Sequence, residues 1–429
     1  MSRGASLNPS CDRSSVSRSE FLLEAAAVKA LIATLLSYLQ LSTRTRGFTM
    51  FLVEFRGVVT ATCVIALEFD LQILAELLQV TPRFVRGFRH GQRQQYSSPP
   101  TEARHLCPIP TFFLAETEDL DLQSFQSHVV RVAKAGVGPL LAGSMGEGIH
   151  LTHVERIALI RAARKALDDA DLRHVPIIAG TGTGSTRETV ELCLEAAQAG
   201  ADYVIVIASG YFSGVLAGHK EALKAFWMDV SAKSPIPVII YNYPGASAGI
   251  DLDSDLITEL ATNCPNLAGV KLTCGNVGKL TRICATVSDP SFSASHGRDP
   301  TIPFLVLGGF VDFIVPSAFA NGHGAITGLA NIAPHATMRL FELAEAAKDD
   351  LSFLPKAQRL QAIIARADFT IAKASIAGTK ALLEKLYGYG GSPRRPLPPI
   401  DVDAAAQLWS THIHRLWCHS NEKSAGSLD

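Results

Sequence analysis

The sequence contains no closely spaced cysteine pair, no long run of Lys and Arg, and no uninterrupted apolar span of membrane length. Eight cysteines are scattered through 429 residues, and none forms a C-x-x-C pair. That spacing disfavours a disulfide framework or a zinc site and favours a reducing compartment. The formal net charge is −1, so no nucleic-acid partner is expected.

The first hundred residues contain two apolar stretches, 21–41 and 48–67, and charged side chains interrupt both. The interrupting residues are Glu24, Lys29, Glu54 and Arg56. A membrane-spanning helix needs about 20 mostly apolar residues, so neither stretch predicts a span and no membrane partner is expected. Residues 1–19 are rich in Ser and Arg, which is compatible with a mitochondrial leader. We interpret residues 1–100 as an N-terminal extension and expect a cytoplasmic protein.

From residue 101 onward, short apolar runs alternate with segments of helical periodicity. With 47% hydrophobic and 18% charged residues, the chain has the composition of a globular protein with a large core. The apolar runs predict eight strands, at 106–112, 138–142, 175–180, 203–208, 238–241, 268–272, 304–307 and 325–328. Eight strand–helix units in this order predict a parallel sheet that closes into a (β/α)8 TIM barrel over residues 101–335.

Helix signals separate the predicted strands. Helical periodicity covers 122–135, 152–168, 186–199, 219–232 and 253–263. Thr152-x-x-Glu155 and Ser185-x-x-Glu188 are capping boxes placed before two of these helices. Further helices are predicted at 334–347, 357–377, 380–387 and 404–414. We expect residues 336–429 to form a C-terminal helical extension that packs on the barrel.

Lys271 is a charged residue at the centre of an apolar strand pattern, L-A-G-V-K-L-T over 267–273. Burial disfavours the ammonium form, so the pKa should fall and a neutral amine can attack a ketone to form a Schiff base. Tyr241 ends the preceding predicted strand, where a phenol can carry protons. Active residues of such barrels project from the C-terminal strand ends, so both side chains should share one pocket. The alternatives are a rim or ion-paired Lys271 and a core Tyr241.

The turn Gly143-Ser144-Met145-Gly146-Glu147 directly follows the second predicted strand. Small residues let backbone N–H groups approach a ligand, and a following helix N-terminus favours an anion. The Ser144 hydroxyl and the amides of Ser144 and Met145 are therefore candidates for binding a substrate carboxylate. A tight turn that binds nothing is the alternative.

Other polar patterns do not indicate a ligand site. Gly180-Thr-Gly-Thr-Gly184 lacks the G-x-G-x-x-G spacing and the Gly-Lys-Ser/Thr ending of a phosphate loop. His150 and His153, near Glu147, are interpreted as surface or supporting groups. Without a convincing His/Asp/Glu cluster, a metal-dependent reaction is disfavoured and no metal is expected.

Three motifs, G-S-M-G-E, Y-N-Y-P and G-V-K-L-T, occur in this order on the barrel pattern. Together they resemble the dihydrodipicolinate synthase/N-acetylneuraminate lyase family. The resemblance runs from about residue 107 to 399. Within the family, residues 201–212, 241–252 and 269–283 look most like fungal L-threo-3-deoxy-hexulosonate aldolases.

This resemblance implies roles for individual residues. Lys271 would form the imine with pyruvate or a 2-keto acid, Tyr241 would shuttle the proton, and Ser144 and Met145 would bind the keto-acid carboxylate. Other positions implied to line the substrate pocket are Thr273, Gly308 and Ile326. The resemblance also implies a homotetramer or homodimer, with no cofactor beyond the lysine imine.

The sequence departs from the family pattern at several points. Pro244 leads into Gly-Ala-Ser where the synthase has an arginine, so the carboxylate of aspartate semialdehyde would lack its bidentate partner. Met145 replaces the family's second Thr, and the relay tyrosine contributed across the dimer falls on Phe212. A synthase-style hydroxyl relay is therefore disfavoured. The region before residue 107 and residues 293–303, which look like an insertion, also differ from the family.

These observations predict a class I, Schiff-base aldolase that cleaves a 2-keto-3-deoxy sugar acid. By resemblance the substrate is L-threo-3-deoxy-hexulosonate, and the products are pyruvate and L-glyceraldehyde. One alternative is a 4-hydroxy-2-oxoglutarate aldolase or a pyruvate-condensing enzyme like dihydrodipicolinate synthase. A catalytically silent oligomeric barrel is the alternative from outside the enzymes.

Overall fold

The computed structural model describes residues 105–296, 303–413 and 416. The predicted N-terminal extension, and residues 297–302 of the predicted insertion, lie outside the described residues. The described residues all fall within one compact unit, Tyr96–Asp429.

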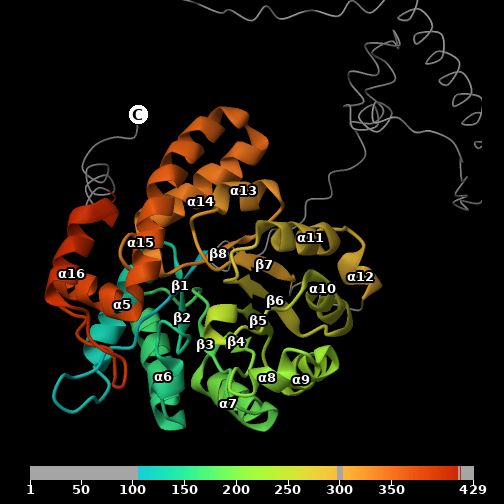
Figure 1. Ribbon diagram of the computed structural model, residues 1–429, viewed down its shortest axis with the longest axis horizontal. Coiled ribbons are helices and arrows are strands. Elements are labelled where there is room, and N and C mark those ends of the chain that lie inside the picture. The colour runs from blue at the N-terminus through green and yellow to red at the C-terminus, as the bar shows by residue number, and fades with distance from the viewer. Residues whose placement is uncertain (1–104, 297–302, 414–415, 417–429) are drawn as a thin grey trace, which may run out of the picture. The chain divides into compact units, whose positions relative to one another are not determined.

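Eight parallel strands form a closed barrel in chain order, as the sequence predicts (Figure 1). The strands are β1 (His105–Pro108), β2 (Gly138–Leu141), β3 (Ile178–Gly180), β4 (Tyr203–Ile207), β5 (Val238–Asn242), β6 (Leu267–Leu272), β7 (Leu305–Gly308) and β8 (Gly324–Ile326). Pairing of β1 with β8 closes the sheet. β1 is shorter than predicted and ends before Ile109.

Helices connect the strands and cover the outside of the barrel (Figure 1). They are α5 (Leu122–Lys134), α6 (His153–Asp169), α7 (Thr186–Ala199), α8 (Ser213–Leu216), α9 (Lys220–Lys233), α10 (Ser254–Asn263), α11 (Val277–Val287), α12 (Phe292–Ser295) and α13 (Ile314–Phe319). The capping box of Thr152 and Glu155 is complete, and Ser185 caps α7 through the Glu188 N–H. The second bond of a capping box, from the Ser185 backbone N–H to the Glu188 carboxylate, is not formed. The Glu188 carboxylate accepts from the Thr183 hydroxyl instead.

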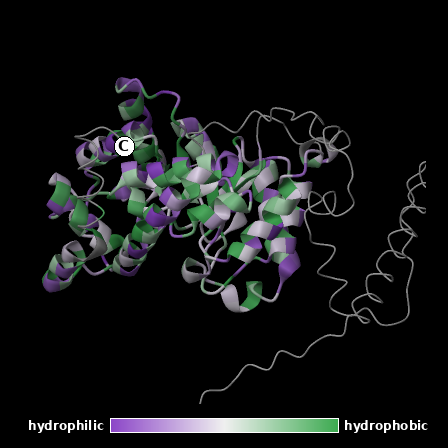
Figure 2. Ribbon diagram, turned by 90° about the horizontal axis from the view of Figure 1, so that it is seen from above, coloured by the Kyte–Doolittle hydropathy of each residue, from purple (hydrophilic) through white to green (hydrophobic). Residues whose placement is uncertain are grey.

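The apolar core has two layers. Ten buried side chains, among them Leu140, Ile205 and Ile326, fill the inside of the barrel. A larger layer packs between the strands and the helices. The helices carry both hydrophobic and hydrophilic residues (Figure 2), as expected when one face is buried and the other is exposed. No helix in the described part of the chain is long and apolar enough to cross a membrane.

The pairing of β5 with β6 contains an irregularity. Val238 pairs with Leu267, but the next residue, Ile239, pairs with Gly269, so Ala268 is an extra residue on β6. Leu267 belongs to the outer core layer and Ala268 to the inner one. A β-bulge of this kind shifts the inside–outside alternation of the residues that follow it.

Lys271 points into the barrel because of this shift. Val270 and Leu272 lie in the outer layer, which leaves Lys271 on the inner side. Continued alternation from Ala268 without the bulge would have placed Val270 inside. Gly269 makes the bulge sterically feasible, because a Cβ at this position would lie 2.3 Å from the Leu305 carbonyl oxygen.

Three further helices follow the barrel: α14 (Pro334–Asp349), α15 (Leu354–Tyr387) and α16 (Val402–Leu408) (Figure 1). The two helices predicted at 357–377 and 380–387 are one 34-residue element with a sharp break at Ser375, where φ is 55° and ψ is −149°. The break lies three residues before the predicted gap. After α15, the chain returns to the barrel mouth through residues 388–400.

Candidate active site

Tyr241 and Lys271 are direct neighbours across β5 and β6. They are paired in the strand register, and the Lys271 Nζ lies 4.3 Å from the centre of the Tyr241 ring. Both side chains are buried, with Lys271 only 4% exposed. The pair sits at the C-terminal ends of its strands, the edge at which active residues of such barrels gather. The structure thus brings together the two residues on which the predicted chemistry depends.

Burial lowers the pKa of Lys271 from 10.5 to about 7. Desolvation of the ammonium is the main cause, and Cys107 on β1 acts in the opposite direction. Burial raises the pKa of the Cys107 thiol far above neutrality, so this thiol carries no charge near pH 7 and gives the ammonium little support. A substantial fraction of Lys271 is therefore a neutral, nucleophilic amine at pH 7.

Two hydroxyl side chains lie near the Tyr241 phenol. The Ser144 Oγ donates to the phenol oxygen over 3.5 Å, and Thr273, directly after β6, is the second. Burial raises the pKa of Tyr241, while both hydroxyls oppose this shift. The Thr273 Oγ1 lies near enough to lower the pKa of the phenol, but its distance and angles do not meet the criteria for a hydrogen bond. A phenol that stays protonated, next to a neutral amine, suits transfer of a proton to and from a substrate oxygen.

The turn from Gly143 to Glu147 is held in an unusual backbone conformation. Glu147 adopts the left-handed region, with φ 53° and ψ 36°, which costs a non-glycine residue roughly 1 kcal/mol. Gly148 is needed directly after it, because a Cβ there would lie 2.1 Å from the Ala142 carbonyl oxygen. The helix N-terminus expected after the turn is displaced: a 3-10 segment, η2 (Gly148–His150), intervenes before α6. An anion at this position would therefore meet the N–H groups of the turn and not a helix N-terminus.

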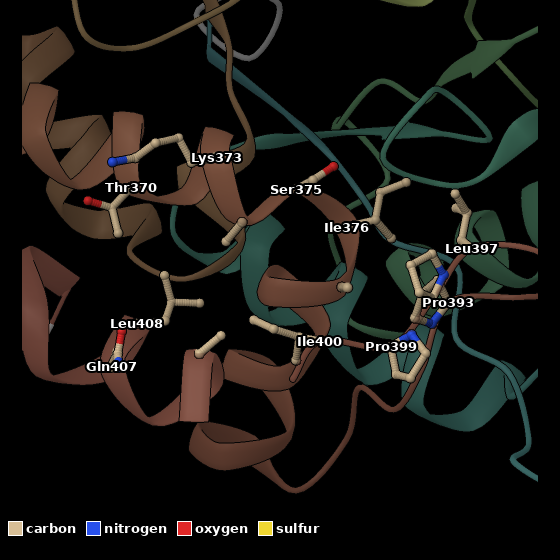
Figure 3. Close-up of a pocket in the computed structure, with 14 residues that line it drawn as sticks. Thr370, Lys373, Ser375, Ile376, Pro393, Leu397, Pro399, Ile400, Gln407 and Leu408 are labelled. Carbon is tan, nitrogen blue, oxygen red and sulfur yellow. The ribbon is translucent and has the colours of Figure 1, made fainter. Parts of the chain in front are cut away.

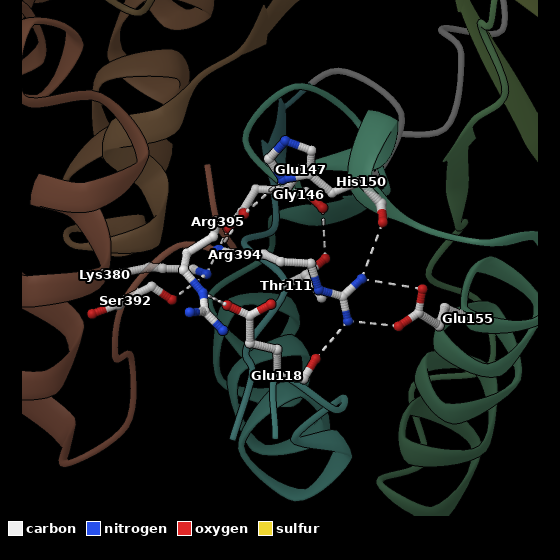
Figure 4. Close-up of polar contacts among 10 residues, drawn as sticks. All are labelled: Thr111, Glu118, Gly146, Glu147, His150, Glu155, Lys380, Ser392, Arg394 and Arg395. Carbon is white, nitrogen blue, oxygen red and sulfur yellow. Dashed lines mark hydrogen bonds and ion pairs between the residues drawn. The ribbon is translucent and has the colours of Figure 1, made fainter. Parts of the chain in front are cut away.

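A buried ion pair ties this turn to the C-terminal helices (Figure 4). The Glu147 carboxylate contacts the Lys380 ammonium over 2.6 Å, and both side chains are fully buried. Its second oxygen accepts from the Arg394 backbone N–H over 2.8 Å and contacts the His150 Nδ1 over 3.3 Å. The Lys380 ammonium also donates to the Ser392 carbonyl over 3.1 Å. No local sequence signal indicated this pair, since its partners are 233 residues apart.

A cavity of about 360 Å³ opens beside the phenol. Ser144 and Tyr241 line it, together with His150 and Arg156. Lys271 is not a lining residue and lies against the Tyr241 ring. His150 was interpreted as a surface or supporting group, and the structure places it on the cavity wall.

Arg156 is a cavity residue that the sequence did not reveal. Its guanidinium is held in place, because its two terminal nitrogens donate to the carbonyl oxygens of Gly180 and Gly148. The bond to Gly180 is 2.6 Å long. These two bonds fix the guanidinium in the cavity wall, where it keeps its positive charge.

The remaining predicted site residues surround the barrel mouth. Gly308 ends β7 and pairs with Leu272 on β6. Ile326 ends β8 and is buried in the inner core layer. The Met145 side chain points toward Gly328, since a Cβ there would lie 3.3 Å from the Met145 Cε. None of Met145, Gly308 and Ile326 lines the 360 Å³ cavity.

A second, more open cavity of about 600 Å³ lies between α15, residues 393–400 and α16 (Figure 3). Ile376 and Leu397 line both cavities, so the C-terminal segment forms the wall between them. Within residues 105–296, 303–413 and 416, no group of three or more His, Cys, Asp or Glu side chains is placed to hold a metal ion.

The sequence matches a family model and is similar to individual proteins. The model of the dihydrodipicolinate synthetase family matches residues 106–413. An L-threo-3-deoxy-hexylosonate aldolase of Aspergillus niger is 40% identical over 310 residues, which cover 70% of this chain and 90% of that protein. An Emericella nidulans protein named as a mitochondrial 4-hydroxy-2-oxoglutarate aldolase is 44% identical over 309 residues, 71% of this chain and 93% of its own length.

Solved structures show the same fold. A dihydrodipicolinate synthase family protein from Coccidioides immitis is 33% identical and superimposes with a TM-score of 0.62, covering 76% of this chain and 98% of its own. A prophage protein from Escherichia coli K12, solved in complex with pyruvate, is 28% identical with a TM-score of 0.61, covering 73% and 98% respectively.

Proposed function

This chain belongs to the dihydrodipicolinate synthetase family, and from that premise we propose that it is a class I aldolase. Its substrate is a 2-keto-3-deoxy sugar acid, and its products are pyruvate and a hydroxyaldehyde. The observation that carries this proposal is the contact between the Lys271 amine and the Tyr241 ring at the strand ends.

The reaction begins at the neutral Lys271 amine. Its nitrogen adds to the C2 carbonyl of the substrate, and loss of water gives a protonated imine. The C3–C4 bond then breaks, and its electron pair moves toward the imine nitrogen to form an enamine. The C4 hydroxyl loses its proton and becomes the aldehyde. Protonation of the enamine at C3, followed by hydrolysis, releases pyruvate and restores the amine.

Tyr241 carries the protons of these steps. Its phenol lies beside the amine and within reach of the Ser144 hydroxyl, so it can deliver a proton to the departing C2 oxygen and accept one from the C4 hydroxyl. The Ser144 hydroxyl and the amides of Ser144 and Met145 hold the substrate carboxylate. Thr273 contacts the substrate hydroxyls. Gly308 and Ile326, which do not line the 360 Å³ cavity, are proposed to contact the part of the substrate bound at Lys271. No metal or organic cofactor is needed, because the protonated imine accepts the electron pair.

The cavity wall favours a polyhydroxy substrate over a dicarboxylate. Among the described residues that line the cavity, Arg156 is the one Lys or Arg, and two backbone carbonyls hold its guanidinium in the wall. Hydroxyl side chains, Thr183 and Ser209, line the same wall. We therefore favour L-threo-3-deoxy-hexulosonate, with L-glyceraldehyde as the aldehyde product. The second candidate is 4-hydroxy-2-oxoglutarate, which the 44% identity to the Emericella nidulans protein supports.

Assembly and compartment complete the proposal. We propose a homotetramer built from dimers, supported by the exposed apolar side chains of Tyr211, Phe212 and Val215 near the barrel mouth. Light scattering on the purified full chain tests it.

We propose a reducing compartment, the cytoplasm or, as the names of two relatives suggest, the mitochondrion. Imaging of a C-terminal fluorescent fusion distinguishes the two.

Turnover with a small substrate panel tests the activity. The full chain is incubated with L-threo-3-deoxy-hexulosonate, its stereoisomers and 4-hydroxy-2-oxoglutarate, and pyruvate release is coupled to lactate dehydrogenase. We expect the highest kcat/KM for the hexulosonate, and no pyruvate release from any substrate with Lys271→Ala. A preference for 4-hydroxy-2-oxoglutarate would select the second candidate, and no release from any of them would contradict an aldolase.

A further inference from the structure

Burying the ion pair of Glu147 and Lys380 costs desolvation free energy that an apolar contact at the same position would not. Both side chains are fully buried, and removing two charges from water is offset only when their geometry is good and their other polar atoms are satisfied. Here the remaining hydrogen bonds come from the backbone of Ser392 and Arg394 and from the His150 side chain. The pair therefore fixes one arrangement of the turn rather than simply adding stability.

We propose that Lys380 is a positioning residue for the turn that carries Ser144 and Met145, so that the C-terminal segment sets the affinity of the active site for the keto-acid carboxylate. This inference rests on the proposed function. Glu147 lies three residues after Ser144, and its N–H donates to the Ser144 carbonyl over 3.1 Å. A shift of the Glu147 backbone thus moves the serine that contacts the Tyr241 phenol.

The surrounding contacts restrict the turn from several sides (Figure 4). The Thr111 hydroxyl donates to the Gly146 carbonyl over 2.7 Å. The Arg394 guanidinium donates to the His150 carbonyl and to the Glu155 carboxylate, at 3.0 and 2.6 Å. Residues on both sides of Glu147 are therefore fixed, and the Lys380 ammonium holds the side chain between them.

The break in α15 explains how Lys380 reaches this position. Ser375 adopts a backbone conformation that is strained for a residue with a Cβ, and the helix changes direction there. The residues after the break place Ile376 on the active-site wall and Lys380 against Glu147. Strain of this kind persists only where surrounding contacts hold it, and the buried ion pair is one such contact.

Three variants test the inference. Lys380→Met removes the ammonium but keeps the length of the side chain. Glu147→Gln combined with Lys380→Met removes both charges, which commonly restores the stability lost on removing one. Lys165→Met is the matched control, because Lys165 forms an ion pair of the same 2.6 Å length with Asp169 on the exposed face of α6.

Each variant is measured by thermal unfolding, by amide hydrogen exchange at Glu147 and Gly148, and by KM and kcat for the keto acid at a temperature where it is fully folded. We expect Lys380→Met to speed exchange at both amides and to raise KM at least about tenfold, the equivalent of one charge-assisted hydrogen bond to the carboxylate. The double variant should recover its Tm but not its KM. Lys165→Met should match the wild type throughout.

Wild-type exchange and KM in folded Lys380→Met would overturn the inference, as would a double variant that recovers KM together with Tm, since a purely structural role predicts both. The exchange measurement needs no turnover, so failure of this inference is distinguishable from failure of the proposed function, in which the wild type itself releases no pyruvate.

Discussion

Replacement of Lys271 by Met should make the protein more stable and inactive. The fall of the Lys271 pKa from 10.5 to about 7 corresponds to on the order of 4–5 kcal/mol, at 1.36 kcal/mol per pH unit. This energy is the cost of folding around an amine that water would have kept charged. A methionine of similar length avoids it, so we expect Lys271→Met to gain about 2–4 kcal/mol in free energy of unfolding at pH 6.

The gain should depend on pH in a defined direction. Between pH 7 and 10.5 the unfolded chain binds a proton at Lys271 that the folded protein does not, so wild-type stability rises with pH in this window. Above 10.5 the amine is neutral in both states and the penalty vanishes. The advantage of Lys271→Met should therefore be largest below pH 7 and should shrink from pH 7 upward.

Urea denaturation of both proteins from pH 6 to 9.5, followed by circular dichroism, measures this difference. Lys279→Met is the matched control, because Lys279 is also 4% exposed but pairs with the Asp251 carboxylate. Removing one partner of such a pair should lower stability. A Lys271→Met protein that is less stable than the wild type at pH 6, or a difference that does not change with pH, would show that burial does not penalise the Lys271 ammonium.

Three further predictions follow from the same geometry. Tyr241→Phe should lower kcat by about 100-fold or more while Lys271 still forms the pyruvate imine; unchanged kcat would exclude the phenol as proton carrier. The kcat/KM should rise with pH up to about 7, where Lys271 loses its proton, and then level off; a rise that continues to pH 10 would show that the amine is not perturbed. Gly269→Ala should destabilise the protein by about 2–3 kcal/mol, because its Cβ would meet the Leu305 carbonyl. Gly214→Ala in α8 is the control, because nothing lies within 4 Å of a Cβ there, and it should leave stability unchanged. Equal melting temperatures for the two variants would contradict the requirement for glycine at the bulge.

The barrel was predictable because each of its units carries a local signal. The runs at β4 and β5 are apolar and bounded by turns, and the complete capping box at Thr152 marks the start of α6. The neighbouring positions of Tyr241 and Lys271 followed from their places at the ends of consecutive strands, since a parallel barrel aligns those ends.

Long-range features were not predictable. The bulge at Ala268 depends on the fit of β6 between its neighbours, and an alternating pattern alone does not show an inserted residue. The pairing of Glu147 with Lys380 joins positions 233 residues apart, so only the folded chain reveals it. The break at Ser375 carries no proline or glycine, and sequence periodicity placed the gap a few residues too late.

Borohydride reduction in the presence of pyruvate shows directly whether the Lys271 amine forms an imine. The full chain is treated with pyruvate and borohydride, digested, and analysed by mass spectrometry. We predict a reduced pyruvyl adduct on the Lys271 peptide of the wild type and none in Lys271→Met. Folded protein without an adduct at Lys271, or with the adduct on another lysine, would contradict it.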